Sequence, residues 1–270
     1  MKANTPKNFA VQLGSLITLY VSVTALLILI FGIINLQFPD ALDRSYYVSE
    51  NARESMRMAI AMLVVFFPTY IVLTRISNQS RRHEEGGEYT TLAKWLVYLS
   101  LLGGGAAVLG DLVTVIIYFL NGEITTRFIL KALAFLVVVG AAFSYYVLDA
   151  RGYFKKNEKQ SIQFGVAASL LVLVTLIYGL MNIETPAEVR EMRLDEQQVS
   201  ELQNIQWQIE EYYRLEKVLP TSLSELYGSL PIPVAPDSRN DYSYEVIDET
   251  TYQLCATFNQ PSVDEYQRYY

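Results

Sequence analysis

The sequence predicts a multi-pass α-helical membrane protein with five transmembrane helices, followed by a small α+β soluble domain. Three observations support this fold class. Of the 270 residues, 51% are hydrophobic and only 18% are charged, whereas a soluble protein carries about 25% charged residues. The apolar residues form long, nearly uncharged runs before residue 182. Most of the acidic residues follow that position, so the first part is expected in lipid and the second in water.

Five apolar runs are candidates for membrane-spanning helices, which need about 20 mostly apolar residues. The first run is far longer than the roughly 7–15 apolar residues of a signal peptide, and no small-residue cleavage site follows it. We therefore expect this segment to remain in the mature protein. The second contains Pro68, which predicts a bend because proline removes a backbone donor and clashes with the preceding turn. The runs lie at about 9–36, 59–74, 95–120, 128–148 and 164–181.

The Lys and Arg residues near these spans predict the orientation of the chain. Ten lie in the N-terminal segment and in the second and fourth connections, against five in the first and third. The richer side is the cytoplasmic one, so the N-terminus is expected in the cytoplasm and residues 182–270 outside it. Those residues carry 17 acidic and 6 basic side chains, a net charge of −11, which is unsuited to an anionic cytoplasmic leaflet.

One acidic residue, Asp111, lies well inside a predicted span. An intramembrane carboxylate is costly and marks a candidate functional site. The short connection at 121–126 makes the third and fourth helices antiparallel neighbours, so Lys131 is the expected partner. With Glu123 and Arg127 these residues form a candidate intramembrane polar site. Three interpretations stay open: a structural ion pair, a proton or ion relay, or a protonated Asp111 bonded to Ser or Thr.

Other chemistry finds little support in the sequence. The single cysteine and the single histidine exclude a disulfide framework and a multi-histidine or cysteine-rich metal site within one chain. The net charge of −7 argues against a nucleic-acid partner. We find no nucleotide-binding glycine motif and no nucleophile motif. We therefore expect no cofactor, no metal and no enzymatic activity.

The region after the last span predicts a long helix, a short helix and a hairpin. Thr185 can cap the long helix, Pro186 fits its first turn, and Glu188 completes a capping box. Apolar residues then recur at helical spacing until Pro220 ends the pattern. The remaining predicted elements are a short helix at 222–227 and two alternating strands at 242–246 and 252–258, packed on the long helix.

Residues 11–151 resemble a bacterial membrane-domain family called domain of unknown function 5671. The matching stretches are IFGIINLQFPDAL, MRMAIAMLVVFFPTY, KWLVYLSLL, GDLVTVIIYFLNGEITTRFILKAL and FSYYVLDAR. The resemblance implies a four-helix membrane domain in a bacterial cytoplasmic (inner) membrane and implies no activity. The motif-bearing positions here are Asp111, Asn121, Gly122, Glu123, Arg127, Lys131 and Tyr146.

Residues 187–258 resemble the globular domain of type II secretion pseudopilins and type IV pilins. The matching pieces are LQNIQWQIEEYYRLEKVLPTSLSEL, Pro236-Asp237, YSYEV and TYQLCATF. Pilins carry a peptidase site and a glutamate at the start of their hydrophobic helix. Here the helix from Phe164 follows four other spans and lacks that glutamate, so a stationary outer domain is expected rather than a filament subunit.

Three parts result: a four-helix membrane domain at 1–158, a fifth transmembrane helix and connector at 159–186, and an acidic extracytoplasmic pilin-like domain at 187–270. We expect a non-enzymatic envelope scaffold or interaction protein. Its expected partners are the lipid bilayer and envelope proteins that contact the acidic domain. The alternative is a small transporter or ion-coupled protein that uses Asp111 and Lys131. A membrane-embedded enzyme would need a pocket lined by the candidate polar site.

Overall fold

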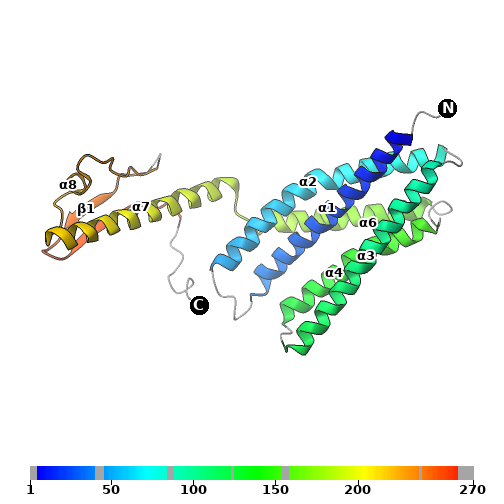
Figure 1. The fold of residues 1–270 in the computed structure, drawn as a ribbon, viewed down its shortest axis with the longest axis horizontal. Helices are drawn as coiled ribbons and strands as arrows, with labels where there is room; N and C mark the ends of the chain where they lie inside the picture. The colour runs from blue at the N-terminus through cyan, green and yellow to red at the C-terminus, as the bar shows by residue number, and fades with distance from the viewer. Residues whose placement is uncertain are drawn as a thin grey trace. The chain divides into compact units, whose positions relative to one another are not determined.

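The computed structural model describes residues 5–39, 46–83, 88–122, 125–151, 153, 158–236 and 239–260. Long helices dominate this part of the chain, and one small antiparallel sheet follows them (Figure 1). The helices are α1 Thr5–Gln37, α2 Tyr46–His83, α3 Glu88–Leu120, α4 Thr126–Ala150, α6 Glu158–Leu180, α7 Pro186–Glu216 and α8 Leu223–Tyr227. The strands are β1 Ser243–Val246 and β2 Tyr252–Cys255.

Five of these helices are long and apolar enough to cross a membrane, as the sequence predicts. Their surfaces agree with a lipid environment, because large apolar side chains such as Leu102 and Leu120 are more than 70% exposed. A soluble monomer rarely exposes so much contiguous apolar surface. The candidate spans are Phe9–Gln37, Ser49–Ser77, Tyr98–Leu120, Thr126–Asp149 and Lys159–Leu180.

The helix α2 is much longer than the run at 59–74 predicted for it. It begins at Tyr46, and charged residues before the apolar run pair along it. The guanidinium of Arg57 donates two hydrogen bonds to Glu50 Oε1, at 3.2 and 3.3 Å. Pro68 lies inside α2, and the helix continues on both sides of it. The run at 59–74 is therefore only the most apolar stretch of α2, whose candidate span extends over Ser49–Ser77.

The chain divides into two compact units, with a boundary in the sequence between Ile183 and Glu184. In the first unit α1 is central, since it contacts α2, α3, α4 and α6. In the most apolar 18-residue stretch of α1, 44% of the residues are buried, whereas only 6% are buried in the corresponding stretch of α3. Most of the surface of α3 is therefore left for lipid or other proteins. The fully buried side chains of this core include Ala25, Leu29, Met56, Ala59 and Leu63.

The antiparallel helices α1 and α2 pack tightly at Gly32. A methyl group added there would collide with Met56 Cγ and lie 2.8 Å from its sulfur. Met56 has no exposed surface, so it has little room to move. At the other end of the pair Ser15 Oγ and Thr74 Oγ1 are 2.7 Å apart. Glycine at position 32 therefore sets how closely the two helices pack.

Replacing Gly32 with alanine is expected to destabilise the first unit by about 1–3 kcal/mol, because the added methyl group overpacks the α1–α2 contact. Unfolding of the purified protein in mild detergent, followed with increasing urea, measures the change. Gly140→Ala is the matched control, since nothing lies within 4 Å of a methyl group added there. Equal losses in the two variants would contradict the close-packing role of Gly32.

The second unit confirms the predicted capping box and hairpin. The side chain of Thr185 accepts a hydrogen bond from the Glu188 N–H, and Glu188 Oε2 accepts one from the Thr185 N–H at 2.7 Å. These bonds hold the pKa of Glu188 below its ordinary value. In the hairpin Ser243 pairs with Cys255 and Val246 with Tyr252. The second strand ends at Cys255 rather than at residue 258.

Candidate functional site

The predicted intramembrane site depends on how α3 and α4 align. The rings of Tyr118 and Phe128 stack with their centroids 4.3 Å apart, which sets the antiparallel register. Counting back from this stack places Lys131 level with Val115. Asp111 then lies four residues further along α3, about 6 Å at 1.5 Å per residue. Sequence adjacency therefore predicted the right pair of helices, since α3 and α4 are in contact.

The structure records no ion pair between Asp111 and Lys131, both of which it describes. Lys131 Nζ instead lies 5.9 Å from the centroid of the Phe31 ring of α1, a cation–π geometry. Asp111 is half-buried, and within the described residues it makes no hydrogen bond. Arg127 is also half-buried, and Glu123 lies outside the described residues. The Asp111–Lys131 pair therefore stays a prediction.

A row of buried polar side chains on α1 was not predicted from the sequence. Ser77 Oγ donates to Gln12 Oε1 at 2.8 Å, and Tyr20 donates to the Ser100 carbonyl at 3.2 Å. The signal in the sequence is the spacing of these polar residues, which recur every three to four positions within an apolar run. Such hydrogen bonds join helices in membranes, and these ones tie α1 to α2 and α3. The buried members are Gln12, Ser15, Thr18 and Ser22.

In the second unit, one flank of α7 is covered by α8 and by the approach to β1. The hydroxyl of Tyr242 donates to Glu201, and Tyr212 donates to Glu225 Oε1 at 2.9 Å. Burial raises the pKa of the Tyr242 phenol, and its hydrogen bond to the Glu201 carboxylate raises it further. Next to this flank Ile205 and Ile209 have no exposed surface and form the centre of a separate core.

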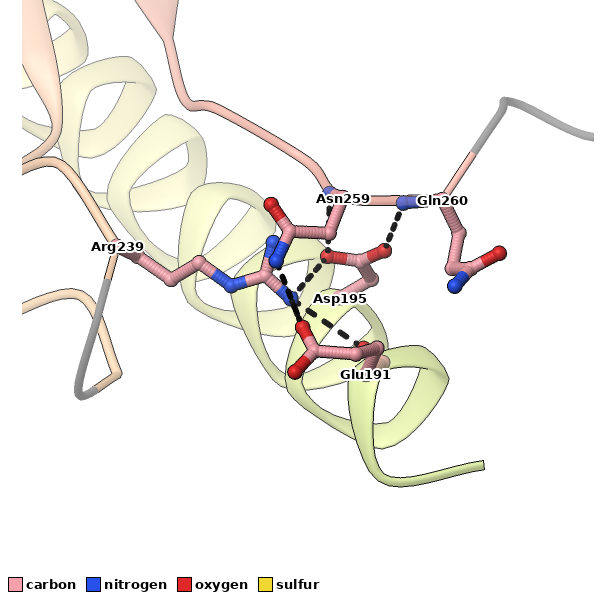
Figure 2. A network of polar contacts seen from close by, with 5 residues as sticks. All are labelled: Glu191, Asp195, Arg239, Asn259 and Gln260. Atoms are coloured by element: carbon pink, nitrogen blue, oxygen red, sulfur yellow. Dashed lines mark hydrogen bonds and ion pairs between the residues drawn. The ribbon is translucent and has the colours of Figure 1, made fainter. Parts of the chain in front are cut away.

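A buried ionic cluster holds two further segments onto the first turns of α7 (Figure 2). The side chain of Arg239 is 1% exposed, and its Nη2 lies 2.8 Å from Glu191 Oε2 and 2.9 Å from Asp195 Oδ1. The backbone N–H groups of Asn259 and Gln260 donate to the Asp195 carboxylate at 3.3 and 2.9 Å. We call these five residues the Arg239 clasp. It fixes the loop before β1 and the segment after β2.

The opposite flank of α7 borders an open groove, which we call the α7–β2 groove. Burial raises the pKa of its Tyr252, and the nearby Glu210 carboxylate raises it further. Both polar and apolar groups line this groove, and no lining side chain is charged. The lining residues are Val199, Leu202, Gln203 and Gln206 of α7, with Tyr252 and Leu254 of β2.

A metal site finds no support in the described residues, which contain no group of three or more His, Cys, Asp or Glu side chains placed to hold an ion. The comparison with protein families gives one match. The family described as Domain of unknown function (DUF5671) matches residues 8–146, a little over half of the chain and the part that holds α1 to α4. No curated protein and no solved structure matches the chain, so the likeness of residues 187–258 to pilins stays a prediction.

Proposed function

Because the chain belongs to the family described as Domain of unknown function (DUF5671), whose description states no activity, we propose its role from its architecture. The chain is a non-enzymatic membrane protein that displays its C-terminal unit for contacts with other envelope proteins. The observation that carries this proposal is the division into two units. A separately cored unit follows the last apolar helix, and it keeps an open groove on one side.

The surface of the C-terminal unit supports a role in protein contacts. Trp207, Leu230 and Val234 are at least 60% exposed, and exposed aromatic and aliphatic side chains are typical anchors of protein interfaces. The acidic side chains of the Arg239 clasp are occupied by structural contacts. A catalytic site needs reactive groups that converge on one point. The C-terminal unit instead presents a partner protein with a shaped and charged surface.

The side of the membrane follows from the distribution of Lys and Arg, which favours a cytoplasmic N-terminus and a C-terminal unit outside the cytoplasm of a bacterial cell. The order of a long helix, a short helix and a hairpin after the last span supports a pilin-like module. Because four spans precede that helix, the module serves as a fixed outer domain. The alternative role in transport rests on Asp111 and Lys131, and no observed contact joins these two residues.

Labelling of spheroplasts with a membrane-impermeant maleimide that carries a photoreactive group tests both halves of this proposal. In a Cys255→Ser background, Ser200→Cys places a thiol on an exposed position of α7. We expect the reagent to label this thiol from outside. Irradiation is then expected to join the chain to another envelope protein.

Gln160→Cys, exposed near the start of α6, is the matched control and is expected to react only after lysis. Labelling of Gln160→Cys but not of Ser200→Cys would overturn the proposed orientation. Labelling at position 200 without any protein adduct would overturn the role in protein contacts. The two halves of the proposal therefore fail separately.

A further inference from the structure

We propose that the α7–β2 groove binds an extended, basic segment of a partner protein, which adds as a third strand to the edge of β2. This inference rests on the proposed function and names the chemistry of the partner. Its starting point is the asymmetry of α7. Glu201 and Tyr212 on one flank contact Tyr242 and Glu225, whereas Val199 and Gln206 lie on the other flank and line the groove.

The groove and the unpaired edge of β2 lie on the same side of the unit. β1 pairs with one edge of β2 along residues 252–255. Tyr242, directly before β1, lies on the covered flank of α7, since its hydroxyl contacts Glu201 there. The opposite edge of β2 therefore faces the flank of Val199 and Gln206. Within the described residues no backbone hydrogen bond engages this edge.

An unpaired strand edge is a template for another strand. An extended peptide that adds to it gains main-chain hydrogen bonds, and its alternate side chains enter the neighbouring groove. In this unit those side chains would meet Leu202, Leu254 and Val199, which are half-buried. The Arg239 clasp holds the segment after β2 against α7. The edge is thus fixed before binding, which reduces the entropic cost of association.

The acidic residues beside the groove favour a basic segment. Glu196 and Glu210 are both exposed, and helical spacing puts them on the flank that lines the groove. They are 14 residues apart, which is about 21 Å along a helix. An extended segment of six residues spans about 20 Å. A strand with a basic residue at each end and apolar or β-branched residues between them therefore matches the groove in length and charge.

A second copy of the chain fits this surface less well. Residues 182–270 carry a net charge of −11, so two C-terminal units repel each other. A basic partner is instead attracted to this unit and oriented by its field. The occupant is accordingly a segment of a different protein.

The test measures binding of fluorescein-labelled Lys-Val-Thr-Val-Thr-Lys to the full-length protein in nanodiscs, by fluorescence anisotropy. Because main-chain hydrogen bonds form with many different side-chain sequences, a generic strand-forming peptide is a suitable probe. We expect saturable binding and slower hydrogen exchange of the backbone amides of β2. The double variant Glu196→Lys, Glu210→Lys is expected to raise the Kd about tenfold, which corresponds to about 1.4 kcal/mol.

The matched control is Glu216→Lys, Glu245→Lys, which changes the net charge equally at exposed positions outside the groove. It is expected to change the Kd less than about threefold. Equal weakening in the two double variants, or binding without protection of β2, would overturn the proposed site. If the peptide fails to bind while the thiol at position 200 still gives a protein adduct, the proposed function stands and the groove is excluded.

Discussion

Replacing Arg239 with alanine is expected to destabilise the C-terminal unit by about 2–3 kcal/mol, because the change removes the buried cation that two partly exposed carboxylates share. The Arg239 side chain is 1% exposed and pairs with Glu191 and Asp195. Without the guanidinium, these two carboxylates face each other with no cation between them. Hydrogen exchange of the full-length protein in nanodiscs, read by mass spectrometry, gives the opening free energy of α7.

The matched control is Arg214→Ala, which removes an ion pair with Glu211 on the surface of the same helix. The Arg214 side chain is 67% exposed, and exposed pairs contribute about 0–1 kcal/mol. The two variants remove the same side chain from two environments, so their difference reports the effect of burial. Similar opening free energies in both would contradict a structural role for the Arg239 clasp.

The second large effect is expected from Ile205→Ala, which should lower the opening free energy of α7 by about 2–5 kcal/mol. Ile205 has no exposed surface and lies at the centre of the core that α7 shares with the hairpin. The change removes buried apolar atoms and leaves a cavity. The same hydrogen-exchange experiment measures it, and Leu230→Ala, at a position 65% exposed, is expected to change stability by less than about 0.5 kcal/mol.

The Ile205 variant also tests whether the two units are independent. Their cores share no residue, so exchange in α1 and α2 is expected to stay unchanged while exchange in α7 accelerates. Faster exchange in all three helices would show that the two units open together. Independence is what the proposed display of the C-terminal unit needs.

Local features of the fold were predicted well from the sequence. The family resemblance over residues 11–151 is confirmed by the match over 8–146. Thr185 and Glu188 form the predicted capping box, since a helix start depends on residues within one turn. The predicted run at 59–74 is shorter than α2, because apolar content marks only the most hydrophobic stretch and the helix also includes charged residues such as Glu50 and Arg57.

The candidate sites were harder to predict. Asp111 and Lys131 were paired from the closeness of their helices, and counting from the stack of Tyr118 on Phe128 leaves an offset of about one turn between them. The Arg239 clasp was missed because Arg239 meets Glu191 across 48 positions of sequence. The residues within one helical turn of Arg239 or of Glu191 give no sign that these two side chains pair.

The sequence by itself determined the number of helices long and apolar enough to cross a membrane, the charge of the two parts and the start of α7. Each follows from the composition of a short window, where transfer to lipid or a helix cap decides the outcome. Only the tertiary structure decided which polar groups meet and which flank of α7 stays open. Those contacts depend on how whole surfaces pack, since side-chain shape fixes register only when two elements come together.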